Sequence, residues 1–378
     1  MSVKMVTMNP PYDDIVATID PSPLLVDEVR GHETTHDDEI DTHDEIHHSI
    51  NSSATDSNTG ETHPIHPPTW RHPFSSTGAY FSELSGFFSW RFLSWLAIDN
   101  CCVSGGAFSL IMALGLPLFK ELGIGASRQQ LYMSMMMSPW AMKPFIGVAS
   151  DLFTIQGYNK RYFALYSILI GLVGSSAILG IYHLGSAESA IQQGADAVGR
   201  LADTIVICFT AVSYEAATLD ILGEGKYAEM MNLHPESGSS IISFKFGWSL
   251  LGGIVSQSYV GPLSDAGYFH VLICTAVVLS LTPFYPTLVG WIPEKARTVN
   301  EPGMTKLCNG CLFDKGSFEE RKTPFIIITL CGLSAPLLAA VTTYANLEIG
   351  LVFAAVLILA FVVATFYIFP RTVSASRY

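Results

Sequence analysis

The apolar and polar positions divide the chain into a polar stretch followed by a series of long apolar runs. From about residue 96 onward, each run is close to the ~20 residues that an α-helix needs to cross a bilayer. The fourth and fifth runs are less apolar than the others, which is typical of helices buried among helices. The pattern therefore predicts an all-α integral membrane protein. Its eight expected spans lie near residues 96–119, 131–153, 162–182, 204–222, 241–260, 269–292, 325–344 and 349–369.

Residues 1–90 have no such apolar periodicity and are rich in Ser, Thr, Asp and His. They hold 15 of the 33 acidic residues and three basic ones. Such a segment buries too little apolar surface to offset the entropy of ordering, so we expect a disordered, acidic, His-rich tail. Its histidines either belong to a solvated tail or bind zinc or copper weakly. The net charge of −13 describes this tail, and no basic stripe indicates a nucleic-acid partner.

The basic residues between the spans are distributed unevenly. If the tail is inside, the inside loops hold nine Lys and Arg residues and the outside loops hold three. This asymmetry follows the positive-inside rule and predicts a cytoplasmic N-terminus in a multi-pass protein, which we expect in the plasma membrane. Residues 91–292 then form a six-helix unit, residues 293–323 a cytoplasmic loop, and residues 324–378 two further helices with a short C-terminus. This layout is that of a major-facilitator-like helix bundle.

The seven cysteines do not indicate a disulfide framework. Five fall within spans, where a thiol acts as a small apolar residue, and the other two form the Cys308-x-x-Cys311 pair of the cytoplasmic loop. One such pair is half a zinc site at most, so a palmitoylated or reduced pair is expected rather than a metal site. No phosphate-binding glycine loop or nucleophile–base arrangement is present, so we expect neither an enzyme nor a cofactor.

Lys143 lies in the middle of the second span, between Pro139 and Pro144. The prolines remove backbone donors, so this helix should bend there. A lysine inside a bilayer costs roughly 2.5 kcal/mol or more, which makes it a functional hypothesis by default. We therefore expect Lys143, with the neighbouring Trp140, to bind substrate or take part in coupling. The alternative is a structural lysine paired with a carboxylate elsewhere in the bundle.

The second span ends in a pattern that is typical of a transporter gate. Gly147 allows close approach of another helix, and Asp151 precedes the basic pair Lys160-Arg161 at the cytoplasmic end. Breaking and remaking such a contact would bias the inward-open against the outward-open state. Asp265 closes the fifth span in a similar Gly-x-x-x-Asp sequence, either as a second gate element or as a plain tight turn.

The fourth and fifth spans carry further polar and aromatic candidates. Glu215 lies about halfway across the fourth span, where a neutral, proton-carrying form fits, and Tyr214 precedes it. Asp220 is nearer the cytoplasmic surface, where we interpret it as an interfacial carboxylate of the gate. Lys245 either snorkels to that surface or reaches Asp220, and Trp248 follows it as a candidate for substrate binding.

Four strings carry a resemblance to a known family. They are MSPWAMKPFIGVASD at 137–151, GKYAE at 225–229, SFKFGWSLLGG at 243–253 and VGPLSD at 260–265. Over about residues 90–370 the chain resembles the folate–biopterin transporters, which are related to the major facilitators. The resemblance implies alternating-access transport of folates or pteridines, coupled to protons, with S-adenosylmethionine as an alternative substrate. A folate dianion needs a cation for a carboxylate and aromatic rings for its flat pterin.

The chain departs from that family in two ways. The basic pair follows Asp151 at nine and ten residues, about twice the spacing of the major-facilitator signature. In addition, only about eight spans are predicted, where the family has a complete second half. We therefore keep three interpretations: a truncated product, a partial sequence, or a chain that assembles with a partner chain. The alternative function is a non-transporting paralogue that binds a ligand or a partner.

Overall fold

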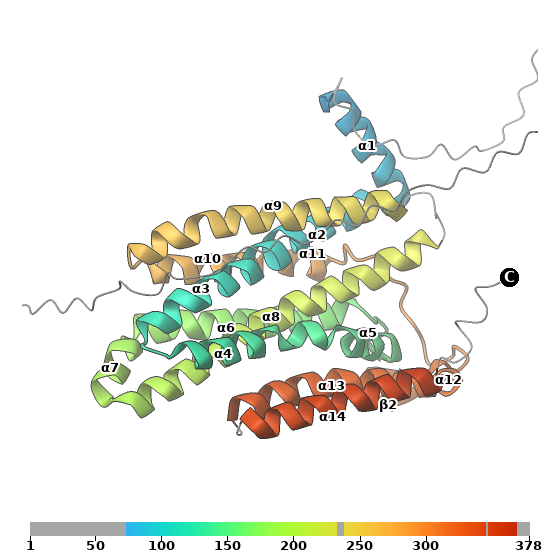
Figure 1. The fold of residues 1–378 in the computed structure, drawn as a ribbon. Coiled ribbons are helices and arrows are strands. Elements are labelled where there is room, and N and C mark those ends of the chain that lie inside the picture. The colour runs from blue at the N-terminus through green and yellow to red at the C-terminus, as the bar shows by residue number, and fades with distance from the viewer. Residues whose placement is uncertain (1–72, 233–237, 345–346, 369–378) are drawn as a thin grey trace, which may run out of the picture. The chain divides into compact units, whose positions relative to one another are not determined.

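The computed structural model describes residues 73–232, 238–344 and 347–368, and these are helical almost throughout (Figure 1). The prediction of an all-α chain is confirmed. Residues 1–72 of the expected disordered tail lie outside the described residues. For residues 73–88 that expectation is wrong, because they form helix α1 (Pro73–Phe88). The aromatic side chains of this segment give it partners: Phe81 packs edge-on against Phe244, with ring centroids 5.9 Å apart.

The first predicted span is one continuous helical stretch with an unusual middle. It comprises α2 (Trp90–Ile98), the π-helix η1 (Asp99–Ala107) and α3 (Phe108–Glu121). The π-helix packs against α9 (Gly238–Asp265), and glycines make this close approach possible. A Cβ atom at Gly252 would lie 2.0 Å from the Cys101 carbonyl oxygen, and one at Gly105 would lie 2.2 Å from the Ser249 carbonyl oxygen. The two backbones are therefore in direct contact here.

The second predicted span is interrupted at Met142, where α4 (Ala126–Ala141) ends and α5 (Lys143–Leu152) begins. Pro144 has no N–H to continue the helical ladder, and the Met142 N–H instead donates to the Pro139 carbonyl at 3.1 Å. The predicted bend between the two prolines is confirmed. It brings Lys143 to the first position of a new helix.

The remaining predicted spans also fall on helices. Within the described residues, five helical stretches are long and apolar enough to cross a membrane: Trp90–Glu121, Arg161–His183, Ala195–Met231, Phe269–Val289 and Lys322–Thr342. The count of eight spans stays a prediction. The helices not yet named are α6 (Arg161–His183), α7 (Ser186–Gln193), α8 (Ala195–Met231), α10 (Phe269–Leu281), α11 (Phe284–Val289), α13 (Lys322–Tyr344) and α14 (Leu347–Ile368).

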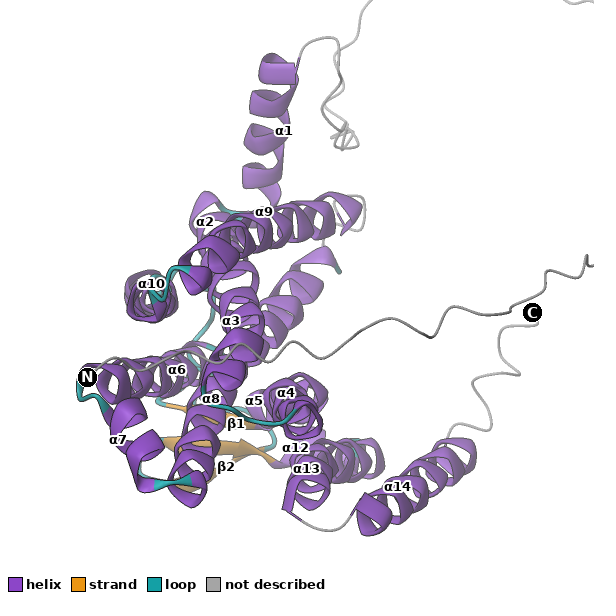
Figure 2. Cartoon of the chain, turned by 60° about the vertical axis from the view of Figure 1, so that its left-hand side comes forward, coloured by secondary structure: helices purple, strands orange, loops and turns teal. Residues whose placement is uncertain are grey.

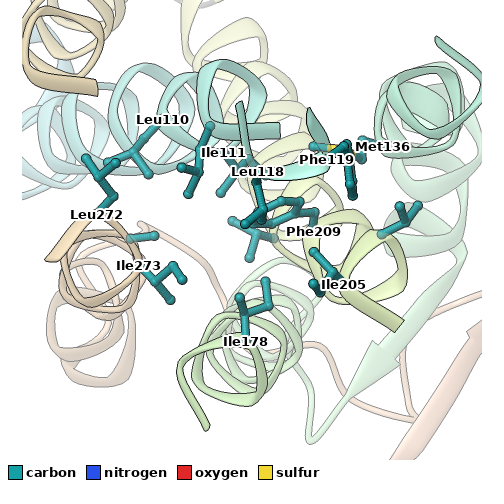
Figure 3. Packing of buried hydrophobic residues seen from close by; sticks show 14 of the residues in the cluster. Leu110, Ile111, Leu118, Phe119, Met136, Ile178, Ile205, Phe209, Leu272 and Ile273 are labelled. Carbon is teal, nitrogen blue, oxygen red and sulfur yellow. The ribbon is translucent and has the colours of Figure 1, made fainter. Parts of the chain in front are cut away.

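The larger buried apolar cluster joins α3, α4, α6, α8 and α10 (Figure 3). Phe119 stacks obliquely on Tyr132, and Phe209 of α8 lies among side chains from the surrounding helices. Between helices that span a bilayer, van der Waals packing of such side chains favours association, because lipid tails are as apolar as the side chains themselves. The cluster holds the helices that carry the site in place.

The predicted cytoplasmic loop is partly folded into a sheet, coloured orange in Figure 2. Strand β2 (Met304–Cys308) and β3 (Cys311–Asp314) form a hairpin, and β3 also pairs antiparallel with β1 (Phe153–Ile155) from the α5–α6 connector. Gly310 makes the turn with a φ of 91°, a value that glycine adopts at little cost. A short helix, α12 (Lys315–Glu320), then leads to α13. Both cysteines of the pair are free and face each other across the hairpin.

Candidate functional site

A buried cluster of charged side chains joins α5, α8 and α9. Asp220 of α8 accepts a hydrogen bond from the Lys143 ammonium through Oδ2, and its Oδ1 lies 2.7 Å from the Lys245 ammonium. Lys245 also pairs with Glu224, one helical turn after Asp220 on the same face of α8. The side chains of Asp220 and Lys245 are 6% and 5% exposed. One carboxylate thus bridges two lysines from two different helices.

This geometry decides between the earlier interpretations of Asp220 and Lys245. The contact between Lys245 and Asp220 that the sequence left open is confirmed. Asp220 is buried and paired with both lysines and is not an exposed interfacial carboxylate, whereas its role in the gate stays a prediction. Burial without these partners would leave a costly unpaired charge. The pairing of Lys143 with a carboxylate is also found, whereas its functional role stays a prediction.

Trp140 adds an aromatic surface and an unused donor to the cluster. The Lys143 ammonium lies 4.0 Å from the centre of the Trp140 ring, within the range of a cation–π contact. The ring also packs against Phe108, with centroids 4.9 Å apart. The Trp140 Nε1–H is buried and has no hydrogen-bond partner within the described residues. An unsatisfied buried donor of this kind suits a ligand acceptor or an ordered water.

Asp99, in the first turn of the π-helix, is a buried acid that the sequence interpretation missed. It is fully buried, and its Oδ1 has no partner among the described residues. It interacts electrostatically with Asp220, Lys245 and Lys143. The available signal was an acidic residue inside the first apolar run. Insertion of π-turns is common at functional sites.

Glu215 is fully buried on another part of α8. Its side chain lies against Gly171 of α6, where a Cβ atom would be 1.9 Å from Oε2. Ser280 of α10 faces it with a hydroxyl. Neither carboxyl oxygen of Glu215 nor the Ser280 hydroxyl has a hydrogen-bond partner in the part of the chain that the structure describes. The neutral, proton-carrying form of Glu215 stays a prediction.

Three predicted residues lie apart from this cluster. Tyr214 is half-buried and interacts with Thr218 and with Tyr166 of α6. Trp248 packs edge-on against Phe244, with centroids 6.2 Å apart. Asp265 is exposed at the end of α9, with no ion pair among the described residues. The contacts of these residues among the described part of the chain therefore do not include Lys143.

The other predicted gate residues gather near the start of α6. The Lys160 ammonium forms an ion pair with Asp151 and lies 2.9 Å from the Ser150 hydroxyl oxygen. The Arg161 guanidinium donates a hydrogen bond to the Leu288 carbonyl at the end of α11. Gly147 faces α8, with the Ile221 side chain 3.3 Å from where its Cβ would be. Asp151 is 62% exposed, so its ion pair contributes little stability.

Glu294 completes this group from the segment after α11. Its carboxylate accepts hydrogen bonds from the backbone N–H groups of Lys160 at 2.7 Å and Arg161 at 3.0 Å, which caps the N-terminus of α6. Burial raises the pKa of Glu294, and these two hydrogen bonds oppose that shift. A cavity of about 620 Å³ opens beside it, lined by charged side chains of both signs that include Lys226 and Glu229. The described residues contain no group of three or more His, Cys, Asp or Glu that could hold a metal ion.

Comparison with known proteins places this geometry in a family. Residues 106–369 match the BT1 family. Over 161 residues the chain is 25% identical to a protein named probable folate-biopterin transporter 6 from Arabidopsis thaliana. That match covers 41% of this chain and 29% of the relative.

A second relative is the folate-biopterin transporter of Synechocystis sp. (strain ATCC 27184 / PCC 6803 / Kazusa), 26% identical over 201 residues. The match covers 53% of this chain and 36% of the relative, so both matches span about a third of the relatives' length. No solved structure matches the chain significantly. Because the family match extends over most of the chain, from the π-helix to the last described helix, this protein is a member of the BT1 family.

Proposed function

We propose that this protein moves folates or pteridines across a membrane by alternating access, coupled to protons. The observation that carries the proposal is the buried cluster in which Asp220 bridges Lys143 and Lys245 beside Trp140. Intramembrane charges usually face a bundle interior and mark substrate or ion pathways. The names of the two relatives point to the same class of substrate.

The chemistry of folate fits this cluster. A substrate carboxylate can exchange with Asp220 on the Lys143 ammonium, since Asp220 keeps Lys245 as its second partner. The Trp140 ring offers a face for the flat pterin, and its free Nε1–H offers a donor for a pterin carbonyl. Exchange of one buried partner for another avoids leaving either charge uncompensated.

The group around Lys160 supplies the gate of the proposed mechanism, on what we infer is the cytoplasmic side. Lys160, Asp151 and Glu294 join the end of α5, the start of α6 and the segment after α11. In the state that opens this end, the contacts would separate, and in the other state they would re-form. The exposed ion pair is weak enough for this exchange.

Uptake of labelled folate, biopterin and S-adenosylmethionine into cells without their own transporters tests the proposal. Lys143→Ala should abolish folate uptake at unchanged surface expression, while Lys120→Ala, at an exposed helix end, should keep it. Loss of the protein from the membrane in Lys143→Ala would instead support a structural lysine. Correct insertion with no uptake of any of the three compounds would contradict transport of this type, and ligand binding without uptake would favour a non-transporting binding protein.

A further inference from the structure

Among the described residues, the surroundings of Lys143 and Lys245 hold more carboxyl groups than these two lysines can balance. Lys143 and Lys245 are balanced by Asp220 and Glu224, with which they form ion pairs. Asp99 is fully buried beside this set, and it has no ion pair within the described residues. Ionisation of Asp99 would therefore place an uncompensated negative charge in the interior, where such a charge is expensive.

The charged groups around Asp99 come from three neighbouring helices. Lys143 of α5, Asp220 of α8 and Lys245 of α9 all interact with it electrostatically, and so does Glu215 of α8. Its own neighbour Asn100 places an amide nitrogen 3.5 Å from Oδ2, and that amide also donates to the Leu96 carbonyl at 2.9 Å. The electrostatic energy of an ionised Asp99 therefore changes whenever the pairing of Asp220 with the two lysines changes.

Glu215 differs from Asp99 in this respect. Its interacting groups are Ser280 and Asp99, and no ammonium group is among them. Its side chain is also held against Gly171. Glu215 therefore lacks the interactions with Lys143 and Lys245 that Asp99 has, so a change at Lys143 acts on Asp99 more directly than on Glu215.

From these contacts we infer that Asp99 is the residue whose protonation couples anion binding at Lys143 to proton movement. The inference rests on the proposed function and names its coupling residue. When a substrate carboxylate replaces Asp220 on Lys143, the cluster gains one negative charge. A neutral Asp99 tolerates that charge, whereas an ionised Asp99 repels it.

The coupling works in both directions, as linkage requires. Protonation of Asp99 strengthens anion binding, and anion binding strengthens protonation by the same factor. Release of the proton on the other side of the membrane then adds a charge beside Asp220 and weakens the hold on the anion. A substrate without a carboxylate escapes this effect, because it does not change the charge of the cluster.

Ligand binding by the purified full chain in detergent tests this inference, with tryptophan fluorescence as the signal. Folate, a dianion, and biopterin, which carries no carboxylate, are the two probes. The affinity of the wild type for folate should fall about tenfold between pH 5.5 and pH 7.5, a factor typical of coupled sites. Its affinity for biopterin should change little. Asp99→Asn mimics the neutral acid and should bind folate with one high affinity at both pH values.

Asp196→Asn serves as the matched control, since Asp196 is exposed in the first turn of α8. Asp196→Asn should keep the pH dependence of folate affinity that the wild type shows. Asp99→Glu should restore the pH dependence that Asp99→Asn loses. The inference is overturned if Asp99→Asn keeps the wild-type pH dependence or if biopterin shows the same dependence. It is also overturned if replacing sodium by choline abolishes folate binding, since the coupling ion would then be sodium.

A readout without any substrate separates the inference from the proposed function. Dicyclohexylcarbodiimide reacts with neutral carboxylic acids in apolar surroundings, and mass spectrometry locates the adduct. Labelling of Asp99 should be strong at pH 5.5. Bound folate should increase this labelling relative to the protein without folate. If neither probe binds the wild type, the proposed function fails. If probes bind but Asp99 is never labelled at pH 5.5, the coupling role of Asp99 fails alone.

Discussion

Replacing Lys143 by Met and Asp220 by Asn, singly and together, tests whether Asp220 holds the two lysines as one unit. Lys143→Met leaves Asp220 its second contact, the Lys245 ammonium at 2.7 Å. The loss is then one charge-assisted hydrogen bond and the ring contact, and we expect about 1.5–3 kcal/mol in the free energy of unfolding. Asp220→Asn removes the carboxylate from both lysines and leaves Lys143 without an anionic partner, which should cost roughly 3–5 kcal/mol.

The double variant carries the sharper expectation. Without Lys143, the substitution of Asp220 leaves no orphan ammonium, and Lys245 keeps Glu224. The double variant should therefore be no less stable than Asp220→Asn alone, although it carries one more substitution. Such a coupling between residues in contact is typically 0.5–3 kcal/mol.

The assay is unfolding of the purified variants in mixed detergent micelles with increasing SDS, followed by circular dichroism. Lys120→Met, at an exposed helix end, is the control for the loss of a lysine and should match the wild type. Equal losses in the two single variants, or strictly additive losses in the double variant, would refute the description of Asp220 as a bridge. Folate binding measured on the same samples shows whether a stable variant has also lost function.

Two glycine substitutions give further tests of the packing. Gly252→Ala should prevent folding, because its Cβ would lie 2.0 Å from a backbone oxygen of the π-helix. Gly247→Ala on the same helix should fold, because its Cβ meets nothing within 4 Å. The yield of membrane-inserted protein measures both effects. Gly171→Ala should displace Glu215 and lower the unfolding midpoint, whereas Gly180→Ala, also on α6 and in open space, should keep or raise it by the helix preference of alanine. Equal behaviour within either pair would contradict the close contacts.

Hydropathy was sufficient to predict the helices of the long apolar runs, because each run determines its own local structure, but it missed α1. The bend at Met142 was predictable for the same reason, since Pro139 and Pro144 act on the backbone next to them. The contact between Lys245 and Asp220 was a short step further. Both residues lie near the same end of adjacent helices, and opposite charges inside a helix bundle usually form ion pairs.

The features that escaped prediction depend on contacts between distant segments. The π-helix around Asp99 lies against the backbone of α9, and glycine patterns show close packing without showing its effect on helix type. Trp248 packs against Phe244, one turn earlier on α9, and the elements that this face of α9 meets depend on tertiary packing that its sequence position does not show. Strand β1 spans only Phe153–Ile155, which is too short for its sequence pattern to predict a strand, and its partner β3 lies in a distant part of the chain.

The small sheet shortens the tether between α11 and the pair of helices α13 and α14. Residues 293–323 would reach far if they were an open linker, but the pairing of β1 with β3 fastens their middle to the connector after α5. Only α12 then separates the fastened point from α13, which packs on α4 and α5. Relative movement of α13 is thereby limited to a pivot about the end of β3. A protease site inserted at 298–302 would leave this pivot intact, whereas one inserted in the hairpin would release it.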